Sequence, residues 1–188
     1  ILDAQDQFRI VKRIMKENGI DETKFPVKKI QWFINQQKDE GILPHQIDAG
    51  YNFFVKQSAK VFDLYEKHCQ ANDLVDFAGL LVKSYELLKN NQNLLDYYQK
   101  KFCHILVDEF QDTNRIQYQF IKILHNQNNH VFCVGDDDQS IYGWRGARIE
   151  NIQKIESDFK PIQVIKLEQN YRSTGNILSA SNALIANN

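Results

Sequence analysis

Residues 105–114 read Ile-Leu-Val-Asp-Glu-Phe-Gln-Asp-Thr-Asn, and this stretch decides the fold. Three apolar residues run directly into two adjacent carboxylates, Asp108 and Glu109. An apolar run rich in β-branched residues is typical of a buried strand in a parallel sheet, and the ligands of such sheets bind beyond the carboxyl ends of the strands. One carboxylate there can hold Mg²⁺ while its neighbour orients or deprotonates an attacking water. The stretch therefore predicts half of an ATPase site.

Two more predicted strands end in polar clusters. One leads into Gly-Asp-Asp-Asp-Gln-Ser-Ile-Tyr-Gly-Trp-Arg-Gly-Ala at 135–147, and the other into Glu-Gln-Asn-Tyr-Arg-Ser-Thr at 168–174. Apolar periodicity predicts strands at 104–107, 131–134 and 163–167, and helices from about Thr113, near 148–156 and from Ser173-Thr174 onward. Because strand and helix alternate, the pattern predicts an α/β fold with a parallel sheet.

The first 100 residues lack this alternation and contain no convincing strand. Apolar residues at helical spacing predict four helices there, separated by Asn18-Gly19, Pro26, Gly41 and Pro44 and ending near Asn90-Asn91. A change in composition near residues 72–76 indicates a hinge. We therefore expect an all-helical unit at 1–75 and an α/β unit at 76–188.

Together, the clusters at 105–114, 135–147 and 168–174 resemble motifs II, III and IV of superfamily 1 DNA helicases of the UvrD/Rep/PcrA type. Ile1-Leu2-Asp3 and residues 35–41 resemble the helical 1B subdomain of that family, so the resemblance covers the whole chain. It implies that the helical unit is a 1B-like subdomain inserted into part of a RecA-like P-loop NTPase motor domain, 1A, which carries the three motifs.

The resemblance implies an ATP-dependent 3′→5′ helicase or translocase in repair or replication. ATP and Mg²⁺ are the implied cofactors, and the implied partners are single-stranded DNA, junctions of single- and double-stranded DNA, and repair proteins. One alternative is the helicase part of a helicase–nuclease in recombination. Another is a non-catalytic DNA-binding paralogue, against which the presence of Asp108, Glu109, Gln139 and Arg172 argues.

The resemblance also assigns roles at the ATP site. Asp108 is the expected Mg²⁺ ligand, Glu109 the catalytic carboxylate, and Gln139 the sensor of the γ-phosphate or its attacking water. Tyr171 is expected to stack on adenine and Arg172 to reach the γ-phosphate, as arginine fingers do. The structural alternatives are that the carboxylates favour the start of the next helix and that Tyr171-Arg172 is a surface pair.

Tyr142 and Trp144 lie in a Gly-rich loop and suit stacking on unpaired bases of any sequence; packing in a core is the alternative. Arg145 either contacts a phosphate or pairs with an acid. Gln111 and Asp112 either couple ATP to DNA or cap the following helix.

Composition constrains the remaining possibilities. The net charge of −1 gives no general indication of nucleic-acid binding, so any basic patch must be local, and one candidate is the acid-free window with Lys24, Lys28, Lys29 and Lys38. A solvated helix face is the alternative. Trp32 either packs against a neighbouring subdomain or touches duplex DNA. Three widely spaced cysteines argue for a reducing compartment, and no apolar run approaches the ~20 residues of a membrane span, so we expect a cytoplasmic protein.

One expected element is missing. None of the 8 glycines precedes a Lys-Thr or Lys-Ser pair, so the chain has no phosphate-binding P-loop. In the family that loop lies upstream of residue 1, and the motifs of the second motor domain lie downstream of residue 188. The chain starts without Met and stops in a predicted helix. We therefore expect an excised fragment that has no ATPase activity by itself, although weak binding of single-stranded DNA stays open.

Overall fold

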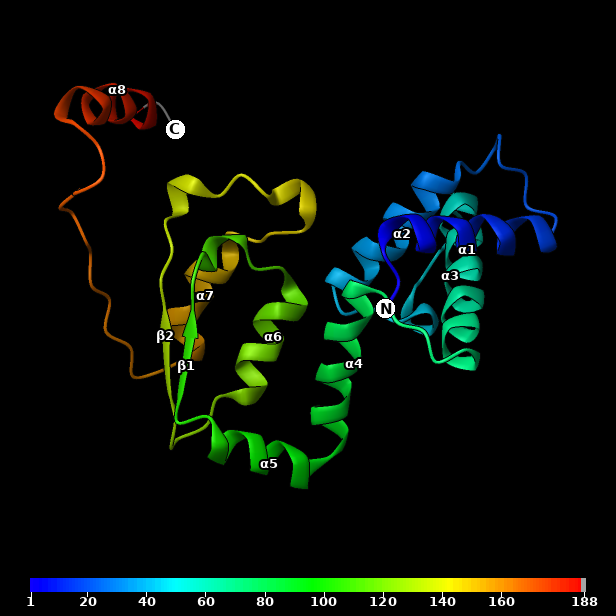
Figure 1. The fold of residues 1–188 in the computed structure, drawn as a ribbon, viewed down its shortest axis with the longest axis horizontal. Coiled ribbons are helices and arrows are strands. Elements are labelled where there is room, and N and C mark those ends of the chain that lie inside the picture. The colour runs from blue at the N-terminus through cyan, green and yellow to red at the C-terminus, as the bar shows by residue number, and fades with distance from the viewer. Residues whose placement is uncertain (187–188) are drawn as a thin grey trace.

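The computed structural model describes residues 1–186, apart from the side chain of Arg145. A helical part lies beside a part that contains the sheet, with α4 between them (Figure 1). The helices are α1 (Ala4–Glu17), α2 (Val27–Asp39), α3 (Phe53–Ala71), α4 (Phe77–Asn90), α5 (Gln92–Lys101), α6 (Arg115–Leu124), α7 (Glu150–Asp158) and α8 (Gly175–Ile185), and the strands are β1 (His104–Val107) and β2 (His130–Cys133). Within residues 1–186, every helix is too short or too polar to traverse a lipid bilayer.

The helical part is held together by the apolar faces of α1, α2 and α3. Asp3 caps α1 by accepting hydrogen bonds from the backbone N–H groups of Gln5 and Asp6, both at 2.8 Å. Asn52 caps α3 in the same way. The fully buried residues of this core are Val11, Met15, Ile30, Ile34, Val61, Phe62 and Tyr65. The prediction of helices in this region is confirmed.

A buried ion-pair cluster joins these three helices to α4. Lys38 on α2 lies 2.7 Å from Asp76 Oδ2 and 2.6 Å from Glu66 Oε1. The same Asp76 oxygen accepts hydrogen bonds from Tyr65 on α3 at 2.7 Å and from Gln7 on α1 at 3.2 Å. Asp76 Oδ1 caps the start of α4 at 2.6 Å. One carboxylate therefore connects all four helices, in the segment 72–76 where composition indicated a hinge.

The sheet is parallel, and its register runs from His104↔His130 to Val107↔Cys133. Buried side chains of α6, α7 and their flanking turns cover one face, with Phe110, Tyr118 and Phe159 in contact. On the other face Leu106 is 75% exposed and Phe132 is 60% exposed. The prediction of a fully buried β1 is therefore wrong: side chains of a strand alternate between two faces, and in the described residues helices cover one face only.

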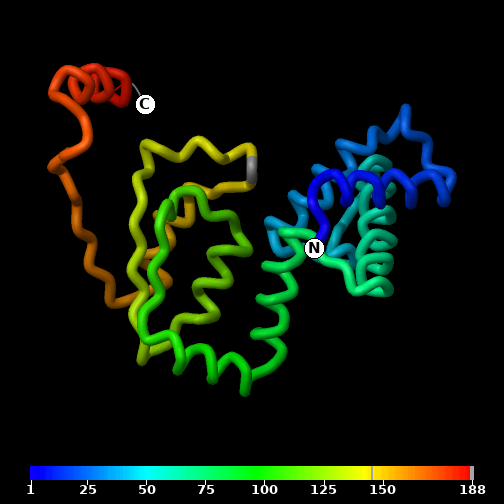
Figure 2. Tube along the Cα trace, viewed as in Figure 1, coloured from blue at the N-terminus to red at the C-terminus, as the bar shows by residue number. Residues whose placement is uncertain are grey.

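The predicted third strand at 163–167 is wrong as well. Residues 161–170 form neither helix nor strand, and Val164, Ile165 and Leu167 are exposed. Figure 2 shows this segment running away from α7 as a separate trace that leads to α8. A strand forms only where its N–H and C=O groups meet a partner, and in the described residues this apolar run pairs with neither β1 nor β2.

The predicted helices of the second part are confirmed with shifted starts. α6 begins after Asn114, which forms a capping box with Gln117, rather than at Thr113. α7 and α8 occupy the regions predicted for the last two helices. One helix was not predicted: α5 starts directly after α4 because Asn91 ends one helix and caps the next, accepting from the N–H of Leu94 at 3.1 Å.

Candidate functional site

The two carboxylates of the opening stretch lie at the carboxyl end of β1. Asp108 is exposed, and its Oδ1 accepts a hydrogen bond from the backbone N–H of Glu109 at 2.9 Å. Glu109 adopts a left-handed backbone conformation (φ 49°, ψ 45°), which is uncommon outside glycine. The chain turns sharply there, and the N–H of Phe110 donates to the carbonyl of Val134 at 2.9 Å. Both carboxylates are thereby presented at the strand end.

Gln111 links this strand end to the end of β2. Its side chain is 1% exposed. Its Nε2 donates to Glu109 Oε2 at 2.7 Å, and its Oε1 accepts from the backbone N–H of Asp136 at 3.0 Å. A Cβ added at Gly135 would lie 2.8 Å from that Oε1, so any larger residue there would displace the amide of Gln111. Helix capping by Gln111 is therefore wrong, since Asn114 caps α6.

Gln139 joins the same network from the other side. Its Nε2 donates to Asp136 Oδ2 at 2.7 Å, while Asp136 Oδ1 accepts from the N–H of Asp138 at 3.1 Å. The hydrogen bonds thus run from Glu109 through Gln111 and Asp136 to Gln139. The structure brings together two residues that the sequence predicted separately for one site.

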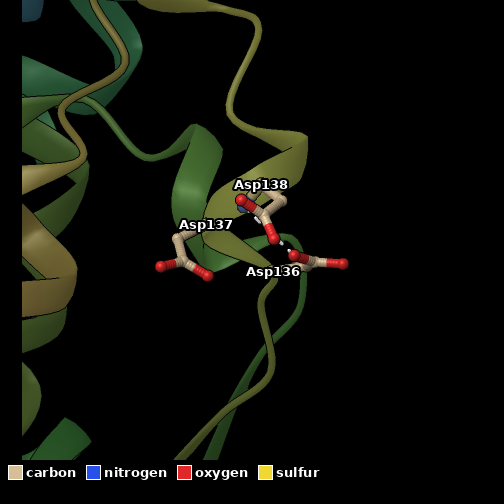
Figure 3. A group of neighbouring side chains, drawn as sticks. All are labelled: Asp136, Asp137 and Asp138. Atoms are coloured by element: carbon tan, nitrogen blue, oxygen red, sulfur yellow. Dashed lines mark hydrogen bonds between the residues drawn. The ribbon is translucent and has the colours of Figure 1, made fainter. Parts of the chain in front are cut away.

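Three consecutive aspartates directly precede Gln139 (Figure 3). Carboxylate oxygens of Asp136, Asp137 and Asp138 lie within 4.8 Å of one another, and all three side chains are exposed. Asp136 already accepts from two donors. The hard, exposed carboxylate of Asp108, next to Glu109, fits a magnesium ion that also binds phosphate oxygens.

The aromatic loop follows directly after Gln139. Tyr142 and Trp144 form a tilted pair with ring centroids 6.4 Å apart, and Trp144 is 68% exposed. Gly146 closes the turn in a left-handed conformation (φ 84°) by donating to the carbonyl of Gly143 at 3.0 Å. Packing in a core, the alternative for these aromatics, is wrong because both rings lie at the surface. The side chain of Arg145 falls outside the described residues.

Comparison with known proteins identifies the family of this chain. Residues 1–160 match the family described as UvrD/REP helicase N-terminal domain. The chain belongs to the UvrD/Rep helicase family.

Relatives in this family are similar along the whole chain. DNA helicase II of Haemophilus influenzae is 53% identical over 188 residues, and that of Escherichia coli is 52% identical. The ATP-dependent DNA helicase Rep of Buchnera aphidicola subsp. Schizaphis graminum is 41% identical over 189 residues. All of this chain is covered in each case, but it spans only 26% of the two DNA helicase II proteins and 29% of the Rep protein.

Tyr171 and Arg172 stand apart from the strand-end network of this UvrD/Rep-family chain. Tyr171 is 91% exposed, and the N–H groups of Arg172 and Ser173 both donate to Asn170 Oδ1 at 2.9 Å. In the part of the chain that the structure describes, neither side chain has a hydrogen bond or ion pair with the strand-end network. They follow the apolar segment that has no sheet partner, and their roles at the ATP site stay predictions.

The predicted basic window is only partly a surface feature. Lys24, Lys28 and Lys29 are exposed, but Lys38 is 4% exposed and belongs to the ion-pair cluster with Asp76. Including Lys38 in a basic patch was wrong, because its position on α2 points it into the helical core. Trp32 is 58% exposed, so most of its ring is not packed within the described residues.

Sequence reasoning missed two sets of functional-site contacts. The first is the role of Gln111 as a bridge, for which its place two residues after Glu109 is the only local signal. The second is a pair of contacts at the end of α2: Asp39 with Asn114, just before α6, and Glu40 with Arg148, beyond the aromatic loop. No local pattern indicates that second contact, because its partners are 75 and 108 positions apart along the chain.

Proposed function

We propose that this chain is part of an ATP-dependent DNA helicase that moves 3′→5′ on single-stranded DNA and acts in repair or replication. The observation that carries the proposal is the continuous hydrogen-bond path Glu109–Gln111–Asp136–Gln139. It connects a strand-end carboxylate suited to ATP hydrolysis with the segment that bears the exposed aromatic pair. A motor needs such a physical connection between its nucleotide site and its track.

Each group has a role in this proposal. Asp108 would hold Mg²⁺, which when bound to phosphate oxygens neutralises part of their charge. Glu109 orients the hydrolytic water or takes its proton, and its turn geometry is fixed by its left-handed backbone and by Gln111. Gln139 donates to phosphate or accepts from water, as a neutral amide can do both. Tyr171 and Arg172 are proposed to contact adenine and the γ-phosphate, and the motif alone supports them.

The same proposal covers the architecture. Residues 1–75 would be a 1B-like subdomain, and residues 76–188 part of a RecA-like motor domain 1A. The parallel pairing of β1 with β2, joined through α6, supports this assignment. The names of the relatives, DNA helicase II and ATP-dependent DNA helicase Rep, support DNA and ATP as ligands. Junctions between single- and double-stranded DNA and repair proteins are the proposed partners.

The test is ATP hydrolysis by the complete protein that carries these residues, with and without single-stranded DNA. Glu109→Gln should lower the DNA-stimulated rate by about 10²-fold or more, since it removes a catalytic carboxylate. Glu156→Gln, at an exposed acid on α7, is the matched control and should leave the rate unchanged. Trp144→Ala should raise the DNA concentration needed for half-maximal stimulation. A rate of hydrolysis that changes neither with DNA nor with Glu109→Gln would contradict the proposal and favour a non-catalytic scaffold.

A further inference from the structure

The two residues after Asp112 are contacted from two directions. From α2, Asp39 Oδ1 accepts a hydrogen bond from Asn114 Nδ2 at 2.9 Å. From α7, the buried Asn151 donates through Nδ2 to the carbonyl of Thr113 at 3.0 Å and to its Oγ1 at 3.1 Å. The backbone N–H of Arg148 also donates to the carbonyl of Thr113, at 3.0 Å. The segment that follows the strand-end carboxylates is therefore held between the helical part and the region just after the aromatic loop.

An ion pair closes this arrangement directly. Arg148 donates to Glu40 through both Nε (3.0 Å to Oε1) and Nη2 (2.6 Å to Oε2). Arg115, the first residue of α6, approaches the same carboxylate at 3.7 Å. A two-point guanidinium–carboxylate contact fixes orientation as well as distance. Glu40 follows the last residue of α2, so this ion pair attaches the helical part to the chain at Arg148.

The Glu40–Arg148 ion pair is connected to the aromatic loop itself. The N–H of Ala147, next to Arg148, donates to the carbonyl of Tyr142 at 3.2 Å, which closes the loop onto its own start. The loop backbone also lies against α2, since a Cβ added at Gly146 would come within 3.5 Å of Asp39 Cβ. Two independent contacts therefore set where the loop sits relative to the helical part.

The Glu40–Arg148 pair lies outside the hydrophobic cores. Side chains of Glu40 and Arg148 are 18% and 39% exposed, and neither belongs to a hydrophobic core. Because the apolar cores do not include this pair, its loss should leave the fold intact and release the loop. We propose that Glu40 is a positioning residue that holds the Tyr142–Trp144 loop in register for base stacking through Arg148. This inference rests on the proposed function of the loop in DNA binding.

The test uses the complete protein and a labelled oligo-thymidine strand. Glu40→Gln should raise the DNA concentration for half-maximal ATPase stimulation by about 5-fold, whereas the rate at saturating DNA should fall by less than about 2-fold. Arg148→Gln should do the same, and the double variant should be no worse than either single variant, because both remove one contact. Asp63→Asn is the matched control, since it removes an exposed ion pair of 2.7 Å with Lys67 elsewhere on α3.

A second measurement needs no DNA. In a Trp32→Phe background Trp144 is the sole tryptophan of these 188 residues, which contain 2, and tryptophans elsewhere in the complete protein would be replaced likewise. Glu40→Gln should make the fluorescence anisotropy of Trp144 decay faster, because the loop moves more freely, while Asp63→Asn should not. If DNA did not change ATP hydrolysis by the wild-type protein, both the proposed function and this inference would be overturned. If DNA stimulates the wild type, two results would overturn this inference alone. One is a Glu40→Gln variant that equals the wild type in both measurements, and the other is additivity of the Glu40→Gln and Arg148→Gln effects.

Discussion

Lys38→Met should destabilise the 188-residue chain by about 3–5 kcal/mol, because it removes the cation from a buried ionic cluster. Lys38 Nζ lies 2.6 Å from Glu66 and 2.7 Å from Asp76, and the exposed fractions of the three side chains are 4%, 23% and 6%. Without Lys38, the Asp76 carboxylate keeps its hydrogen bonds from Tyr65 and Gln7 but has no opposing charge. Glu66 can turn toward water, whereas Asp76 cannot.

The chain contains a matched control for this substitution. Lys67 and Asp63 form an ion pair with the same 2.7 Å separation, but their side chains are 69% and 48% exposed. Lys67→Met should cost less than about 1 kcal/mol, since exposed pairs are solvated and screened. Comparing the two Lys→Met variants isolates the effect of burial from that of distance.

The assay is unfolding in urea, followed by the fluorescence of Trp32 on α2 in a Trp144→Phe background. The double variant Lys38→Met/Asp76→Asn should lose about 2–3 kcal/mol less than the sum of its single variants, because it leaves neither member of the pair uncompensated. Two results would refute the reasoning: a Lys38→Met cost no greater than that of Lys67→Met, or strict additivity of the two substitutions.

Acid provides a further check on the same cluster. Burial raises the pKa of Asp76, but the charge of Lys38 and hydrogen bonds from Lys38, Tyr65 and the α4 backbone outweigh it, so the pKa is lowered overall. A lowered carboxyl pKa contributes stability above the unfolded value, about pH 4, and that stability is lost as the pH falls through the folded value. The difference between wild type and Lys38→Met should therefore shrink below about pH 4.

Two further predictions concern polar contacts near the site. Burial, followed by the charge of Glu40, raises the pKa of Asp39 to about 6 against a hydrogen bond from Asn114 that lowers it. Ionisation of this carboxyl therefore destabilises the fold increasingly as the pH rises from about 4 to about 6, and by a constant amount above that. Asp39→Asn should thus raise the free energy of unfolding by about 1 kcal/mol at pH 8, after allowance for solvent screening, and change it little at pH 4; equal effects at both pH values in urea unfolding would count against it. Gln111→Ala should lower DNA-stimulated ATP hydrolysis by the complete protein about 10- to 100-fold, in the range seen when a partner that orients a functional ligand is removed, and a wild-type rate would show that Glu109 needs no such partner.

The elements that the sequence predicted well are those decided by neighbouring residues. β1 and β2 follow from short apolar runs, and α6 follows from Asn114 and the apolar face beyond it. The segment 163–167 has an equally strand-like pattern, yet a strand also needs a partner edge, which a local pattern does not contain. Orientation is limited in the same way: Lys38 belongs to a run of basic residues by sequence, but its place on α2 directs it at Asp76.

In the candidate site, too, the predictable features are those set by neighbouring residues. That Asp108, Glu109 and Gln139 lie at one edge of the sheet was predictable, because parallel strands deliver their carboxyl ends to the same edge, whereas their roles stay predictions from the resemblance. Gln111 was ambiguous, since a buried amide with two partners looks the same in sequence as a helix cap. The contacts of Asp39 and Glu40 were not predictable, because their partners lie 75 and 108 residues away.

The two sets of contacts meet on one short stretch of chain. Gln111 ties its beginning to the end of β2, and Asn114 ties its end to α2. Between them, Thr113 receives the hydrogen bonds of Arg148 and Asn151 from beyond the aromatic loop. A displacement of this stretch cannot alter one set of contacts while leaving the others in place, because four residues carry all three connections. The residues that follow the strand-end carboxylates are thus the physical link between those carboxylates, the aromatic loop and the helical part.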